Sequence, residues 1–139
     1  DGSSNLYRTR QLNDRAQYVV GTNPTTVRQM LAGVTGSISV PTWTATSVSA
    51  FVPPSATRIV LGVSIDIDSS NDAIMVAPNN SYGAYTSTTN KPPVVLAETG
   101  GSGAKGVTTD FLLESTNIYS ASNEADSAVS CLGWFDNTF

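Results

Sequence analysis

Alternation of apolar and polar residues over a dozen positions constrains this chain most. In the stretch TRIVLGVSIDID, branched apolar residues occupy every second position, and polar or small residues fill most of the others. Successive side chains of a β-strand point to opposite faces, so the pattern predicts one long strand with a buried and a wetter face. Such strands are typical of antiparallel sheets. The residues expected on the buried face are Ile59, Leu61, Val63, Ile65 and Ile67.

Shorter segments of the same kind follow, and each ends at Gly, Pro, Asn or Ser. They read DAIMVAP, YGAYT, PPVVLAE, VTTDFLLES, NIYSAS and SAVSCLGWF. Only 13% of the residues are charged and 40% are apolar, with Ser, Thr, Asn and Gly making up much of the rest. Short strands with regular turn signals predict a mainly β fold, an antiparallel jelly-roll-like sandwich that forms a knob over residues 37–139.

Residues 1–36 differ from the rest and are expected to form a shaft or linker segment. Four of the seven Lys and Arg residues lie here. Pro24 at a first turn, after Thr22 or Asn23 as a cap, and Gly33 as a stop predict a short helix over residues 25–32. The stretch NLYRTRQLNDRAQYVV could form another short helix, although it is too short to be stable alone.

Charge and residue types exclude several functions. A net charge of −4 offers no basic footprint for nucleic acid or for an anionic membrane. Histidine is absent, which removes the commonest general base and transition-metal ligand. No apolar run is long enough to span a membrane, and no signal segment opens the chain. The sequence begins without Met, as expected of a fragment or a processed piece.

The acidic residues suggest a metal site only loosely. Asp66, Asp68 and Asp72 fall within seven residues, and calcium prefers carboxylate oxygens. The positions where a calcium-binding EF-hand loop needs Gly and Glu hold Asn71 and Ala77. A strand that ends in a polar turn is the favoured interpretation, and neither a metal nor a cofactor is expected.

Catalytic patterns are equally weak, and the chain is not expected to be an enzyme. A serine nucleophile would have to use Lys91 or Lys105, and nothing in the sequence would desolvate either. Pairs of carboxylates for glycoside hydrolysis can be picked from any chain with eleven acids. Cys131 lies in an apolar segment and is expected to be a buried, unreactive thiol.

Aromatic residues give the better binding signal. The stretch APNNSYGAYTSTTN joins Tyr82 and Tyr85 with Asn79 and Asn80. Tyrosine rings stack on the apolar side of a sugar, and amides bond its hydroxyl groups. A hairpin whose tyrosines pack on neighbouring strands is the simpler interpretation and is favoured.

The last residues, CLGWFDNTF, carry aromatics where chain ends are usually polar. Alternation puts Val129, Cys131, Gly133 and Phe135 opposite Ala128, Ser130, Leu132 and Trp134. Both faces are apolar, which predicts an inner strand or a strand at a subunit interface. Trp134, Phe135 and Phe139 are therefore expected to be buried, in part by neighbouring copies of the chain.

Several segments together resemble the C-terminal knob of bacteriophage tail fibres and tail needles. These are FVPPSATRIVLGVSI, IMVAPNNSYG, DFLLESTNIYSAS and the closing CLGWFDNTF, which fits a GWxDN ending. The resemblance covers residues 37–139 and implies a homotrimer, a jelly-roll-like sandwich and a role at the bacterial surface. It implies no catalytic residues, and residues 1–36 lack the clean heptads of a coiled-coil shaft.

The expected function is thus a structural and host-attachment knob on the virion, outside the host cell, that contacts a bacterial surface glycan or another envelope component. The alternative is an independent carbohydrate-binding module attached to an enzyme. A hydrolase is the weakest hypothesis, because no histidine and no convincing acid pair is present.

Overall fold

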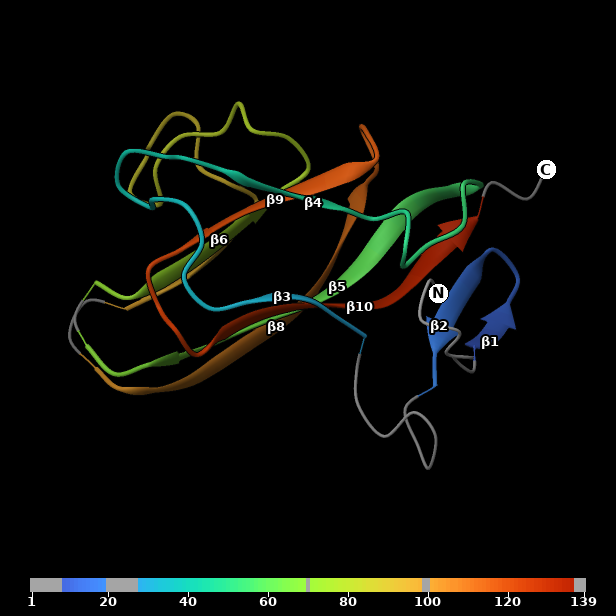
Figure 1. The fold of residues 1–139 in the computed structure, drawn as a ribbon, viewed down its shortest axis with the longest axis horizontal. Coiled ribbons are helices and arrows are strands. Elements are labelled where there is room, and N and C mark those ends of the chain that lie inside the picture. Colours follow the sequence, from blue (N-terminus) through green and yellow to red (C-terminus); the bar gives the residue numbers. More distant parts are fainter. Residues whose placement is uncertain (1–8, 20–27, 70, 99–100, 137–139) are drawn as a thin grey trace.

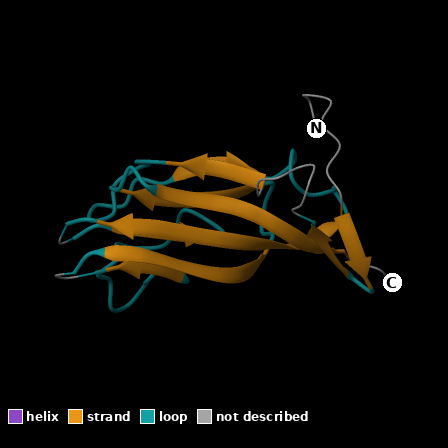
Figure 2. Cartoon of the chain, turned by 90° about the horizontal axis from the view of Figure 1, so that it is seen from below, coloured by secondary structure: helices purple, strands orange, loops and turns teal. Residues whose placement is uncertain are grey.

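The computed structural model describes residues 9–19, 28–69, 71–98 and 101–136, which form a sandwich of two antiparallel sheets (Figures 1 and 2). One sheet has the order β1-β2-β10-β5-β8 with β3 also paired to β10, and the other has the order β4-β9-β6-β7. No helix occurs among the described residues. The strands are β1 Thr9–Leu12, β2 Arg15–Tyr18, β3 Arg28–Ala32, β4 Thr44–Ser47, β5 Ala56–Ile67, β6 Ala73–Ala77, β7 Val94–Ala97, β8 Gly103–Leu112, β9 Asn117–Ser122 and β10 Ser127–Asp136.

Strand β5 is the long strand that the alternation predicts. Its five expected inward residues are all buried in the main core between the sheets. Residues from the facing sheet, including Ile74, Val76 and Ile118, complete this core. The opposite face of β5 is more open, with Arg58 and Ser64 exposed, although Val60 is buried as well. The predicted mainly β sandwich is therefore confirmed.

Strand β10 is an inner strand, paired along one side with β5. Along its other side it pairs first with β3 and then with β2. The strand does not alternate as expected, because its register against β5 shifts between Cys131 and Gly133. Leu132 is the extra residue of this bulge, and a bulge moves the following side chains to the opposite face. Trp134 therefore packs against the same core as Cys131.

The described part of residues 1–36 forms strands, so the predicted helix over 25–32 is wrong from residue 28 onward. Residues 25–27 lie outside the described residues. Pairing of β3 with β10 satisfies backbone groups that a helix would have satisfied locally, and this tertiary pairing outweighs the cap and proline signals. Gly33 does end the element, with φ of 81° and its N–H bonded to the Ser127 carbonyl at 2.8 Å. Residues 9–18 form the β1–β2 hairpin instead of a helix.

The two sheets are covered very differently on their outer faces. All five residues of β6 are buried, because loops over the four-stranded sheet form a second small core. Ile38, Met75 and Ala121 are buried there, and Trp43 and Tyr85 pack against them. The outer positions of β5 and β8 have no such cover from described segments, and most of them are exposed.

Candidate binding surfaces

The residues expected to bind sugar lie in the long β6–β7 loop, which is not the simple hairpin that was expected. Tyr85 packs against the second core, in line with the favoured interpretation of its role. The Tyr82 carbonyl accepts a hydrogen bond from Trp43 Nε1 at 3.2 Å. Asn79 Nδ2 donates to Glu114 Oε2 at 2.6 Å, and Asn79 Oδ1 accepts from the Ser81 N–H. Both polar atoms of the Asn79 amide are thus engaged within the protein.

A cavity of about 450 Å³ lies beside Tyr85, and Thr86, Lys91 and Glu98 also line it. Of the four predicted ligand-binding residues, Tyr85 is the one that reaches this cavity; Asn80 is exposed elsewhere on the loop. An aromatic ring with a hydroxyl, an ammonium and a carboxylate nearby is a combination that suits a polyhydroxyl ligand.

The acidic residues form a cluster that the sequence shows only in part. Oxygen atoms of Asp68, Asp72 and Glu124 lie within 4.8 Å of one another, whereas Asp66 is not a member. Glu124 is distant in sequence and comes from the β9–β10 turn, so sequence spacing could not reveal it. Carboxylates are calcium ligands, but both Asp72 oxygens already accept hydrogen bonds from the turn that Ser69 forms.

The pKa values of Asp68 and Asp72 are shifted in opposite directions. The negative charge of Glu124 raises the pKa of Asp68 above its usual range. Hydrogen bonds from Ser69, chiefly its backbone N–H at 2.7 Å, lower the pKa of Asp72. Asp72 therefore acts as the acceptor that closes a polar turn, which is the interpretation favoured from sequence.

The C-terminal aromatics lie on opposite faces of the six-stranded sheet. Trp134 is half-buried and meets Tyr18 edge to face, with ring centroids 5.5 Å apart. Phe135 is half-buried on the outer face, between the guanidinium groups of Arg15 at 5.8 Å and Arg58 at 5.4 Å. Phe139 lies outside the described residues.

Beside Trp134 lies a buried arginine. Arg28 is 6% exposed, and its guanidinium lies over the rings of Tyr18 and Phe51 and donates to the Ala50 carbonyl. Cys131 is fully buried nearby, and desolvation raises the pKa of its thiol to about 12. The expectation of a buried, unreactive thiol is confirmed as to burial.

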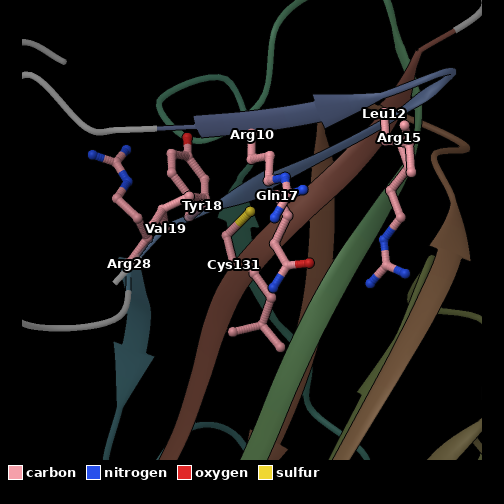
Figure 3. Close-up of a pocket in the computed structure, with 9 residues that line it drawn as sticks. Arg10, Leu12, Arg15, Gln17, Tyr18, Val19, Arg28 and Cys131 are labelled. Atoms are coloured by element: carbon pink, nitrogen blue, oxygen red, sulfur yellow. The ribbon is translucent and has the colours of Figure 1, made fainter. Parts of the chain in front are cut away.

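One candidate binding surface was not predicted from the sequence. A cavity of about 620 Å³, which we call the hairpin cavity, lies between the β1–β2 hairpin and β10 (Figure 3). Three arginines and no acidic residue belong to its described lining: Arg10, Leu12, Arg15, Gln17, Tyr18, Val19, Arg28, Cys131 and Leu132. Residues 10–17 were considered for a helix, so nothing in the sequence indicated that their side chains share a face.

No family model, no curated protein and no solved structure matches the chain. Within the described residues, no helix has the length and apolar character needed to cross a membrane.

Proposed function

We propose that this chain is a non-catalytic attachment head, a homotrimeric knob of a bacteriophage tail fibre or tail needle. In this role it is part of the virion, acts outside the host cell and contacts a glycan or another component of the bacterial envelope. The proposal needs one surface that joins copies of the chain and another that meets the host.

The unequal cover of the two sheets carries this proposal. Strand β6 is buried on both faces, by the facing sheet on one and by the protein's own loops on the other, whereas the outer face of β5 leaves Arg58, Ser64 and Asp66 exposed. The uncovered face also carries Leu112, which is 65% exposed, and the half-buried Phe135. Exposed apolar residues on a sheet face favour contact with another protein surface. We assign the β5 and β8 part of this face to contact between copies, which leaves the opposite edge of the sheet, at the β1–β2 hairpin, outside the contact.

The loop-covered side is then free to meet the host. The cavity beside Tyr85 opens among these loops, and loops on a rigid sandwich are common binding elements. This cavity also favours the second candidate, an independent carbohydrate-binding module attached to an enzyme. The two candidates differ in assembly, because the knob requires a trimer and an attached module works as a monomer.

Light scattering on the purified chain tests the assembly. We expect a mass of three chains at micromolar concentration, and Leu112→Glu should shift it toward one chain by burying a charge at the contact. Val40→Glu is the matched control, since Val40 is 75% exposed on a loop on the other side. A monomeric wild-type chain would refute the knob and support the attached module.

Binding of labelled protein to bacterial cells tests the host contact. Tyr85→Ala should weaken cell binding of a chain that still assembles. A trimer that attaches to no bacterial cell or envelope extract would refute the attachment role.

A further inference from the structure

We propose that the hairpin cavity binds an acidic sugar, by its carboxylate or phosphate substituent, within a surface glycan. This inference rests on the proposed function as an attachment head, and it names a chemical class of ligand and a second binding surface, separate from the Tyr85 loop.

Strand pairing places the cavity's polar side chains together. In the hairpin, Arg10 is paired with Gln17 and Leu12 with Arg15. Directly paired residues of antiparallel strands point to the same face, and so do residues two apart in one strand. All four side chains therefore rise from one face of the hairpin, and the cavity lies against them (Figure 3).

The two exposed arginines of this cavity, Arg10 and Arg15, have no carboxylate among its described lining. Among the described residues, no carboxylate forms an ion pair with Arg10 or Arg15, whereas Arg58 pairs with Asp110. Arg28 lines the cavity as well, with its guanidinium held by the Ala50 carbonyl. Two exposed guanidinium groups are thus available, and guanidinium binds carboxylate and phosphate through paired hydrogen bonds.

The net negative charge of the chain does not cancel this local field. The acidic cluster of Asp68, Asp72 and Glu124 lies beyond the far end of β5 from the hairpin (Figure 1). Asp66 lies eight positions after Arg58 along β5, which is about 26 Å at the usual rise per residue. Salt screens exposed charges over about 8 Å, so this cluster acts only weakly on an anion in the cavity. The nearer carboxylates are Asp14, in the turn of the hairpin, and Asp136, which accepts a hydrogen bond from Gln11 Nε2 at 3.5 Å. Neither belongs to the described lining of the cavity.

The rest of the lining selects a sugar over a bare anion. Leu12, which is 73% exposed, and Leu132 give the cavity apolar walls, and Gln17 offers an amide for hydroxyl groups. A free phosphate would leave these walls unused. A volume of about 620 Å³ falls in the range of small-ligand sites, so one or two sugar units would fill it.

Calorimetric titration tests the ligand class directly. We expect the wild-type chain to bind an oligogalacturonate or glucose 6-phosphate, and to bind the neutral galactose oligomer and inorganic phosphate at least about ten-fold more weakly. The first two ligands distinguish a carboxylate from a phosphate source. Failure of both anionic sugars to bind, or equal binding of the neutral sugar or of inorganic phosphate, would overturn the proposal.

Variants locate the binding. The double change Arg10→Gln and Arg15→Gln should weaken binding about ten-fold or more. It should lower the melting temperature only slightly, because both side chains are exposed and the contact it removes, that of Arg15 with Phe135, lies at the surface. Arg58→Gln removes the same kind of charge from the same sheet outside the cavity and should keep the wild-type affinity. Equal loss in both variants would show general charge attraction and refute the site. A drop in assembled mass with unchanged sugar affinity would assign the arginines to contact between copies, and would also refute it.

Cell binding separates this inference from the proposed function. If wild type and the double variant attach to cells and titrate sugars equally, the hairpin cavity is not the site, although the attachment role stands. If the chain binds acidic sugars through Arg10 and Arg15 but attaches to no cells, the site stands and the attachment role fails.

Discussion

Two substitutions of Trp134 should separate the contribution of its ring packing from the cost of its buried indole N–H. The ring packs against the main core and meets Tyr18, so Trp134→Ala removes a large buried surface and leaves a cavity. Changes of this kind cost about 3–5 kcal/mol of unfolding free energy. For a domain of this size, that corresponds to a fall in melting temperature of about 10–15 °C.

Trp134→Phe should behave quite differently. The indole N–H is buried, and no acceptor among the described residues bonds to it. A buried donor without a partner costs about 1–3 kcal/mol, and phenylalanine removes that cost while keeping most of the packing. The loss of ring area offsets much of this gain, so the unfolding free energy should stay within about 1 kcal/mol of wild type.

Scanning calorimetry at one fixed chain concentration measures both variants, with near-ultraviolet circular dichroism to confirm native packing. Trp134→Phe that melts as low as Trp134→Ala would show that the indole N–H makes an important hydrogen bond. Trp134→Ala that melts like wild type would refute the packing role.

Four further predictions each concern a single residue. Cys131 should not react with a thiol reagent in the native protein at pH 8 and should react fully in denaturant, since its pKa is raised to about 12; fast native labelling would contradict its burial. The pKa of Asp72 is lowered on folding, so its carboxylate stabilises the folded protein at pH 7, and Asp72→Asn should lower the melting temperature there. Wild type should lose this stabilisation as the pH falls below about 4. Asp68→Asn should raise the melting temperature at pH 7, because the raised pKa means that its charge opposes folding; an equal loss in both variants would contradict the assignment. Gly133→Ala should destabilise the protein, because an added Cβ would lie 2.1 Å from the Ala16 carbonyl oxygen; a variant with wild-type melting would show that β2 does not approach so closely.

Sequence alone could predict β5 and its buried face, because twelve uninterrupted residues carry the period of a strand. The same reasoning could not find β1, whose four residues are all exposed and have no apolar face. That strand exists because β2 joins it to β10, a pairing between residues far apart in the sequence. Local propensity carries no information on such a pairing.

The hairpin cavity could not be predicted for the same reason. Its walls come from the hairpin and from β10 at the Leu132 bulge, and the sequence does not say which strand lies beside Gly133. The Tyr85 prediction depended on local sequence only, so the residue could be named, whereas Lys91 and Glu98 as its neighbours could not.

The central position of β10 has a consequence for how the protein is made on the ribosome. Strands β2, β3 and β5 all pair with β10, so each lacks this neighbour until residues 127–136 have left the exit tunnel. Before then β2 can pair with β1 and β5 with β8, but β3 has no other partner strand among the described residues. The six-stranded sheet then closes around a strand that is separated from β2 by most of the chain, and such distant pairings form slowly. Until then the edge of β5 that later pairs with β10 is open to other nascent chains, and unpaired strand edges are a condition under which β-rich proteins aggregate or require chaperones.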